Sequence, residues 1–200
     1  LQQCAALGVQ VRGMSPLEHF IRWGAPKGLD PHPLFSIAWY VGQRPDIAAQ
    51  GQNPLNHYLE RGWREGVSPH PLFDSEWYLA QAGPGAAAQP PLRHYLAEGW
   101  REGFTPHPLF DGAWYLARYP DVARAGAEPL SHYATSGARE GRDPGPWFDS
   151  EHYTALRGAA LPADVNPLVD YLVRGAWMVS EARPGFATAA YIAARPEAAA

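Results

Sequence analysis

Hydrophobic and polar positions along the chain follow one pattern that returns about every 38 residues. In each copy a phenylalanine is followed five positions later by a tyrosine, and a Pro-Leu pair comes further along the same unit. A fixed period of this length is typical of arrays of stacked repeats. Three series, each stepping by 38, 37, 38 and 38, mark the copies: Phe35, Phe73, Phe110, Phe148 and Phe186; Tyr40, Tyr78, Tyr115, Tyr153 and Tyr191; and Pro16, Pro54, Pro91, Pro129 and Pro167.

The start of each unit predicts a short helix with a defined entry angle. In the unit that begins at Phe73, Asp74 is a good N-cap for a helix over 75–80. Phe73 precedes the cap and Tyr78 follows it by four positions, which is the spacing of a hydrophobic staple. The same spacing holds in all five copies. The expected capping residues are Ser36, Asp74, Asp111 and Asp149, with Ala187 in the last copy.

Two further helices are expected to complete each unit. The second is clearest over 120–126, where Pro begins it and Gly ends it, whereas the corresponding 83–86 predicts a loop or a frayed turn. The third begins with a capping box in 15–18 and carries one apolar stripe, as over 55–59. A glycine is expected to end each third helix at the C′ position: Gly24, Gly62, Gly99, Gly137 and Gly175.

None of these helices is long enough to be stable alone in water, so their apolar stripes must be buried against a neighbouring unit. No stretch alternates with period two, which excludes a sheet. The sequence therefore predicts an all-α fold, namely an α-solenoid of short-helix repeats, cut from a longer chain. The expected single array over 1–200 consists of a partial unit 1–34, full units 35–72, 73–109, 110–147 and 148–185, and a partial unit 186–200.

Composition and charge narrow the class of protein. Hydrophobic residues make 46% of the chain and aromatic residues 12%, which indicates a packed chain. The net charge of −4 speaks against a nucleic-acid partner, because such proteins present a basic face. The lone Cys4 excludes an internal disulfide. No run approaches the roughly 18 apolar residues of a membrane span. We expect no transmembrane segment and a cytoplasmic location, with the membrane face as the alternative.

One histidine series forms a ladder of candidate ligands on the third helices. Each member lies two residues after the helix leucine, about 200° around the helix axis from it. A ladder that binds metal or sugar is one interpretation. A histidine that hydrogen-bonds a backbone carbonyl in the adjacent turn is favoured, because metal sites need convergent ligands. The series is His19, His57, His94 and His132, with Asp170 in the fifth copy.

Two other series are expected to be structural. Flanking prolines hold a second set of histidines in extended linkers, where a contact that fills the groove between units is favoured over a ligand role: His32, His70 and His107. The tryptophans beside the stapled tyrosine are expected to pack in the core: Trp39, Trp77 and Trp114.

The candidates for ligand contacts follow the third helix. Tryptophans in this position are expected to be more exposed than the other tryptophan series, and their ring faces could stack on sugars. Arginines beside them could bind phosphate or acidic glycans, although the adjacent Glu in each copy favours a solvated, self-compensated turn. The candidates are Trp63, Trp100, Arg64, Arg101 and Arg139.

Motifs of enzyme chemistry are missing from the sequence. It contains no Gly-x-Ser-x-Gly elbow, no phosphate-cradling glycine loop and no His-Glu-x-x-His pair. Catalytic sites are usually singular, whereas the residues described above come in sets. We therefore expect no catalytic, cofactor-binding or metal-binding residues in this chain, and no cofactor.

The unit formed by 110–123, 129–133 and 137–142 resembles a known repeat. It is similar to the F-D-x-x-Y-L-x-x-Y-P-D-V-A … N-P-L-x-H-Y-x-x-x-G-x-x-E-G-R units attached to bacterial glycosyltransferases and related surface-polysaccharide proteins. The resemblance covers essentially the whole chain. It implies that transfer chemistry would belong to a separate nucleotide-sugar domain, which this sequence does not contain.

These observations favour a non-catalytic helical-repeat scaffold or interaction module. Its expected partner is a protein or an attached catalytic domain of glycan synthesis, and the parent protein could itself be a glycosyltransferase. One alternative is a glycan-binding module that uses the Trp and Arg candidates. A second alternative is a part of a glycosyltransferase that shapes its acceptor site.

Overall fold

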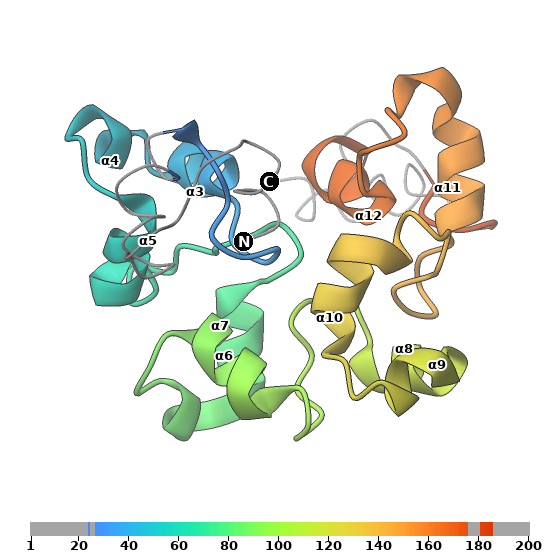
Figure 1. Cartoon of the computed structure of the whole chain (residues 1–200), viewed down its shortest axis with the longest axis horizontal. Coiled ribbons are helices and arrows are strands. Elements are labelled where there is room, and N and C mark those ends of the chain that lie inside the picture. The colour runs from blue at the N-terminus through green and yellow to red at the C-terminus, as the bar shows by residue number, and fades with distance from the viewer. Residues whose placement is uncertain (1–23, 25–26, 176–180, 186–200) are drawn as a thin grey trace, which may run out of the picture.

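The structure is a computed structural model that describes residues 24, 27–175 and 181–185. This part of the chain is helical and contains no β-strand, which confirms the predicted all-α class (Figure 1). Most of the predicted partial unit 1–34 and all of 186–200 lie outside the described residues. His19, Phe186 and Tyr191 are among them.

Each unit contains a first helix, a short second element and a third helix whose last turn widens from α to π geometry. The first unit has α3 (Ile37–Gln43), α4 (Pro45–Ala49), α5 (Pro54–His57) and η3 (Tyr58–Gly62). The second has α6 (Ser75–Ala86), α7 (Pro91–His94) and η4 (Tyr95–Gly99). The third has α8 (Gly112–Arg118), α9 (Pro120–Arg124), α10 (Pro129–His132) and η5 (Tyr133–Gly137). The fourth has α11 (Ser150–Arg157), η6 (Gly158–Ala160), α12 (Pro167–Asp170) and η7 (Tyr171–Gly175).

The predicted helix starts are confirmed. The side chains of Ser36, Asp74, Asp111 and Asp149 each accept a hydrogen bond from the backbone N–H three positions later, as Asp74 does from Trp77 at 2.9 Å, whereas Ala187 lies outside the described residues. Every third helix has a proline at its first turn, and Asn53 and Asn166 cap two of them. In the second unit the expected loop or frayed turn at 83–86 is wrong: Gly83 with φ 71° kinks α6, and the chain after it is helical to Ala86.

The staple rings form the core of each unit. Every Phe and Tyr in these four pairs is fully buried. The tyrosine of the third helix packs against them, as Tyr58 does with its ring centroid 5.5 Å from that of Phe35. Burying a large apolar side chain contributes about 1.5–3 kcal/mol, so these rings dominate the stability of so small a unit. The staple centroid distances are 5.3 Å for Phe35–Tyr40, 5.4 Å for Phe73–Tyr78, 5.7 Å for Phe110–Tyr115 and 5.3 Å for Phe148–Tyr153.

The glycines at the ends of the third helices do not act as C′ residues, which corrects the sequence interpretation. They are the last residues of the π-helical turns. A Cβ at Gly62 would lie 1.9 Å from the Tyr40 hydroxyl, so the close approach of that tyrosine excludes any side chain. Positive φ occurs four residues later: Gly66 at 76°, Gly103 at 86° and Gly141 at 70°.

Successive units are joined through their linkers. The N–H of Ser36 donates to the carbonyl of Pro69 at 2.9 Å, and the corresponding bond recurs at each junction. A second link runs between third helices, since the N–H of Leu92 donates to the Tyr58 hydroxyl at 3.3 Å. The other linker bonds are Asp74 to Pro106 at 2.9 Å, Asp111 to Pro144 at 3.1 Å and Asp149 to Ala182 at 2.9 Å.

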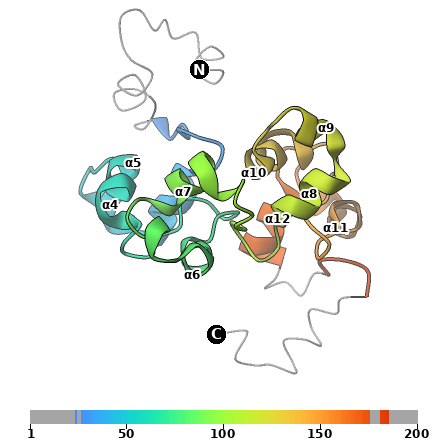
Figure 2. The same cartoon turned by 90° about the horizontal axis from the view of Figure 1, so that it is seen from below.

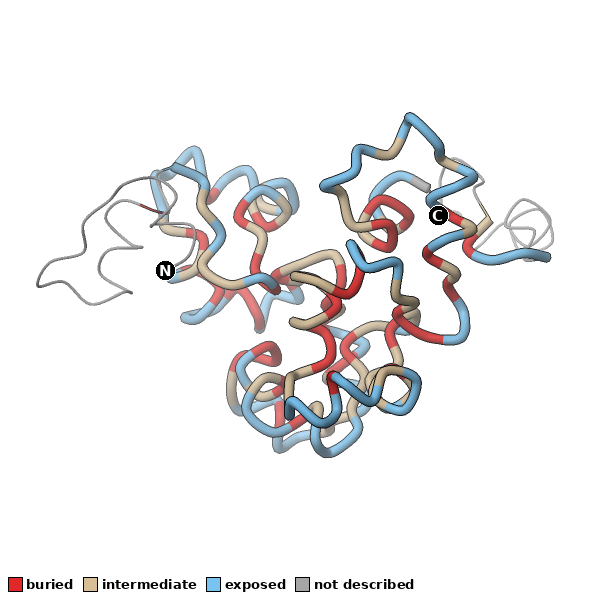
Figure 3. Tube along the Cα trace, turned by 45° about the vertical axis from the view of Figure 1, so that its right-hand side comes forward, coloured by how far each residue is buried: buried red, intermediate tan, exposed pale blue. Residues whose placement is uncertain are grey.

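The units follow one another around an arc, with α7, α10 and α12 on its inner side and α4, α9 and α11 on its outer side (Figure 1). In the view from below, the first two units form the left half of the molecule and the last two units form the right half (Figure 2). Buried segments run through the linkers and the third helices, whereas the second helices and the turns after the third helices are largely exposed (Figure 3).

Candidate functional site: the grooves between units

The histidine ladder is part of the core. The ring of His57 is buried, and its Nδ1 lies 2.8 Å from the Tyr40 hydroxyl. The partner is thus the stapled tyrosine of the first helix and not a backbone carbonyl as expected. Burial raises the pKa of each of these tyrosines, so the hydroxyls stay protonated. The same pair recurs as Tyr78–His94 at 2.5 Å and Tyr115–His132 at 2.9 Å.

In the fourth unit a carboxylate takes the place of this histidine. Asp170 is buried, and its Oδ2 accepts hydrogen bonds from the Tyr153 hydroxyl at 2.8 Å and from Nε of Arg157 at 3.0 Å. An arginine from the end of α11 thus offsets the charge of the carboxylate that stands in place of the imidazole ring. Tyr153 itself keeps the position of the other stapled tyrosines.

We expect Asp170→Asn to lower the free energy of unfolding by about 1–3 kcal/mol, because it removes the buried negative charge that faces Arg157. Urea unfolding at pH 7 measures the change. Arg174→Gln is the control. The Arg174 side chain is exposed and its ion pair with Asp170 is long, at 3.8 Å, so this change should alter stability by less than about 0.5 kcal/mol. Equal effects of both variants would contradict a structural role for the buried pair.

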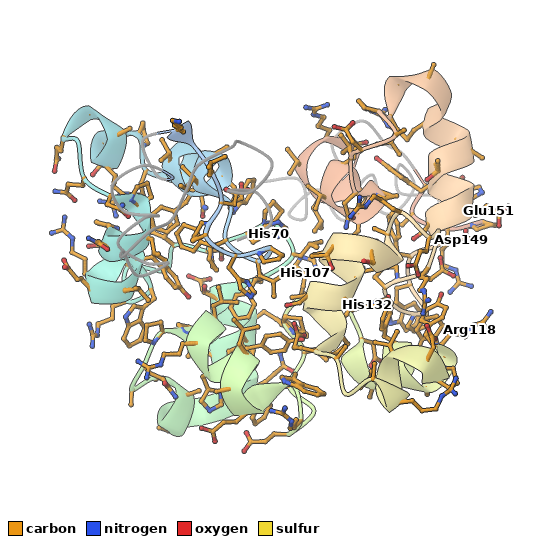
Figure 4. The ribbon with its side chains drawn as sticks, in the orientation of Figure 1. His70, His107, Arg118, His132, Asp149 and Glu151 are labelled. Atoms are coloured by element: carbon orange, nitrogen blue, oxygen red, sulfur yellow. The ribbon has the colours of Figure 1, made fainter. Side chains whose placement is uncertain are left out.

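The linker histidines accept hydrogen bonds from their own turns. Nδ1 of His70 accepts the N–H of Leu72 at 3.1 Å, and Nδ1 of His107 accepts the N–H of Leu109 at 3.1 Å. Burial lowers the pKa of both imidazoles to about 4, so they are neutral at pH 7. Both lie near the middle of the arc, where the linkers meet (Figure 4). Their role is to shape the junction.

The exposure of the tryptophans is the reverse of the sequence expectation. Trp63, expected near the surface, is 4% exposed, whereas Trp77 of the expected core series is 41% exposed. Nε1 of Trp77 instead donates to the Thr105 hydroxyl of the next linker at 3.0 Å. Trp63 belongs to the buried core cluster, and the Arg64 guanidinium lies over its ring.

Two of the candidate arginines stack on the candidate tryptophans. The guanidinium carbon of Arg64 lies 4.2 Å from the ring centroid of Trp63, and that of Arg101 lies 4.3 Å from the centroid of Trp100. Each arginine also donates to the carbonyl four residues earlier: Arg64 to Glu60 at 2.9 Å, Arg101 to Ala97 at 2.9 Å and Arg139 to Thr135. Their charges therefore also stabilise the carboxyl ends of the third helices.

In the first and third units, the glutamate that follows the candidate arginine pairs with a different arginine. Glu65 pairs with Arg44 of the second helix, and Glu140 pairs with Nε of Arg142 at 2.6 Å. Arg142 in turn forms an ion pair with Asp121 at 2.8 Å. The turn after the third helix is thus tied to the second element of its own unit, which leaves the Trp/Arg pairs facing the next unit.

Grooves open where the units meet. An apolar groove of about 630 Å³, the Leu groove, lies between the third helices of the first two units and is lined by Leu55, Leu59, Leu92 and Leu96. Two further grooves lie between the third-helix turn of one unit and the first helix of the next. The Trp100 groove has about 350 Å³ and the Ala138 groove about 640 Å³, each named after a residue that lines it.

The described residues contain no group of three or more His, Cys, Asp or Glu that could hold a metal ion. Within the same ranges, no helix combines the length and the apolar character that crossing a bilayer requires. The repeated tyrosine and histidine side chains hydrogen-bond each other within their own units.

Comparison with known proteins finds no match. No protein-family model, no curated protein and no solved structure is similar to this chain. Functional interpretation therefore rests on the geometry of the grooves and on the residues that line them.

Sequence reasoning missed the Leu groove and the Ala138 groove. Leu59 was assigned to a buried stripe, yet it is 46% exposed, because the neighbouring third helix meets only part of that stripe. The signal for the Ala138 groove was readable in the aligned units, since an alanine stands there where the two preceding units have tryptophan.

Proposed function

We propose that the chain is a non-catalytic scaffold, an α-solenoid whose stacked units hold a protein partner or an attached catalytic domain. The observation that carries this proposal is the internal use of the repeated polar residues. His57, His94 and His132 are each bonded to a stapled tyrosine, so the ladder that could have bound a ligand serves packing. The grooves between units remain as the surfaces for recognition.

The resemblance of the repeat to units attached to bacterial glycosyltransferases supports a partner in surface-polysaccharide synthesis. Glycan binding by the Trp and Arg candidates is less favoured. The indole of Trp63 is buried between units, and the faces of Trp63 and Trp100 are already stacked by Arg64 and Arg101. A sugar would have to displace these guanidinium groups to reach the ring faces on that side.

A photo-crosslinking amino acid at Leu59, which lines the Leu groove, tests the scaffold proposal in the native cells. We expect discrete crosslinked products that include an enzyme of glycan assembly. The matched control is the same amino acid at the exposed Ala48 of α4, on the outer side of the arc, where no discrete product is expected. Equal crosslinking at both positions, or turnover of a nucleotide sugar by the chain alone, would contradict the proposal.

A further inference from the structure

The Trp100 groove and the Ala138 groove are the same place in successive units. Seven residues that line the first have counterparts 38 positions later that line the second: Trp100 and Ala138, Arg101 and Arg139, Gly103 and Gly141, Gly112 and Ser150, Ala113 and Glu151, Leu116 and Thr154, Pro129 and Pro167. Each groove lies between the turn after a π-helical segment and the first helix of the next unit. The molecule thus offers internal copies of one site for comparison.

The three junctions between units differ in how much of the site the indole of the chain's own tryptophan occupies. At the junction of the first two units Trp63 is 4% exposed, so its ring occupies the interface. At the next junction Trp100 is half-buried and lines a groove of about 350 Å³. At the third junction Ala138 stands in the tryptophan position, and the groove has about 640 Å³.

The arginine that stacks on the indole is retained at the third junction. Arg64 and Arg101 lie over the rings of Trp63 and Trp100, and each also donates to the carbonyl four residues earlier. Arg139 makes the corresponding bond to the carbonyl of Thr135. Its guanidinium is therefore held as in the other units, while Ala138 supplies no ring for it.

We propose that the Ala138 groove binds the indole ring of a tryptophan on a partner protein, in the place that Trp63 and Trp100 fill in their own units. Arg139 would stack on the ring, and Leu161, Pro162 and Val165 supply apolar walls. Tryptophan is the aromatic residue that cation–π contacts and protein interfaces favour most. The inference rests on the proposed scaffold function and gives its partner a stated chemistry.

The first turn of α11 forms the opposite wall. Its cap Asp149 and Glu151 lie at the amino-terminal end of this helix, the lower end of α11 in Figure 4, and Glu151 lines the groove. A carboxylate beside the groove favours a tryptophan in a neutral or basic segment of the partner over a tryptophan flanked by acidic residues.

The test is titration of N-acetyltryptophanamide into the ¹⁵N-labelled chain, followed by NMR shifts of Arg139, Ser150 and Thr154. We expect saturable binding to one site with a dissociation constant on the order of 0.1–1 mM. Ala138→Trp should weaken it at least about tenfold, because the chain's own ring then fills the groove. Trp100→Ala should add a second site of the same kind, which keeps the test decisive even if Ala138→Trp unfolds the chain.

Equal binding to the wild-type chain and to Ala138→Trp would overturn the proposal. So would equal shifts with N-acetylleucinamide, which lacks a ring, or stronger binding of N-acetylglucosamine, which would assign the groove to glycans. Trp147 is 61% exposed, so a second copy of this chain could supply the indole. Self-association that Trp147→Ala abolishes would assign the groove to that copy and overturn the heterologous partner. Failure of indole binding with crosslinking at Leu59 intact would refute this inference alone.

Discussion

Gly137→Ala is expected to lower the free energy of unfolding by about 2–5 kcal/mol. A Cβ at this position would lie 2.1 Å from the Tyr115 hydroxyl, which must then move although its ring is fully buried. The shift breaks the 2.9 Å bond to His132 and overpacks the ring cluster. Urea unfolding followed by far-UV circular dichroism measures the loss.

Removing the hydroxyl should reverse the sign of this effect. After that oxygen, the nearest atoms to the Cβ would be His132 Nδ1 and the Tyr115 ring carbon Cζ, both at 3.4 Å, which is an ordinary contact. In a Tyr115→Phe background Gly137→Ala should therefore be neutral or stabilise by up to about 1 kcal/mol. Gly42→Ala is the matched control, because a Cβ there meets nothing within 4 Å, and it should also stabilise. A loss that persists without the hydroxyl would show that the close approach is not its cause.

Local rules were sufficient to predict the helix starts. The staple of Phe73 and Tyr78, the cap at Asp74 and the proline at the start of each third helix depend on residues within five positions of one another. Such short-range geometry follows from backbone hydrogen-bonding needs alone. Because the sequence repeats, the same capped first helix was expected in every unit, and each of the four described units has it.

The helix ends could not be predicted in the same way. A glycine after an apolar stripe usually marks a C′ position, yet Gly62 is the last residue of a π-helical turn, where the Tyr40 hydroxyl from another helix leaves no room for a side chain. This constraint comes from a residue 22 positions earlier in the chain. Propensity rules carry no information about it, and the Tyr40–His57 bond was missed for the same reason.

The candidate grooves depend on contacts between units, which the period alone does not describe. The sequence indicates that neighbours stack but not which face of Trp63 the next unit covers. The exposure of Trp63 and Trp77 was therefore predicted in the wrong order. The alignment of Ala138 with Trp63 and Trp100 needs no structure, but its meaning requires the Arg64 and Arg101 stacking geometry.

Acid is expected to destabilise the fold between about pH 6.5 and pH 4 through the linker histidines. The pKa of His70 and that of His107 are lowered to about 4 by burial, against about 6.5 in the unfolded chain. Between these pH values the imidazoles bind protons in the unfolded chain but not in the folded chain, so the free energy of unfolding falls as pH falls. Both rings keep some exposure, so we expect a loss on the order of 2 kcal/mol for each.

His32 and His57, whose pKa values burial also lowers, destabilise the fold on acidification in the same window, whereas Asp30, Asp143 and Asp121 act with the opposite sign or in a different window. Burial raises the pKa of Asp30 and Asp143 above the usual 3.8, so protonation of these carboxyls on acidification favours the folded state and reduces the net loss. The ion pair with Arg142 lowers the pKa of Asp121 to about 2, so its contribution is lost only below about pH 4. The window above pH 4 therefore reports mainly on the histidines.

The double variant His70→Asn/His107→Asn should remove the part of this pH dependence that comes from these two linkers and leave the part that comes from His32 and His57. An Asn side-chain oxygen can accept the N–H two residues later, as Nδ1 does now from Leu72 and Leu109, and it does not titrate. Urea unfolding at pH 7.5, 5.5 and 4.0 should then show a smaller loss of free energy on acidification than the wild-type chain shows, whereas Asp121→Asn should keep the wild-type slope above pH 4. A double variant that retains the full wild-type slope would show that His70 and His107 do not cause it, and the two junctions that they shape would not be acid-sensitive parts of the fold.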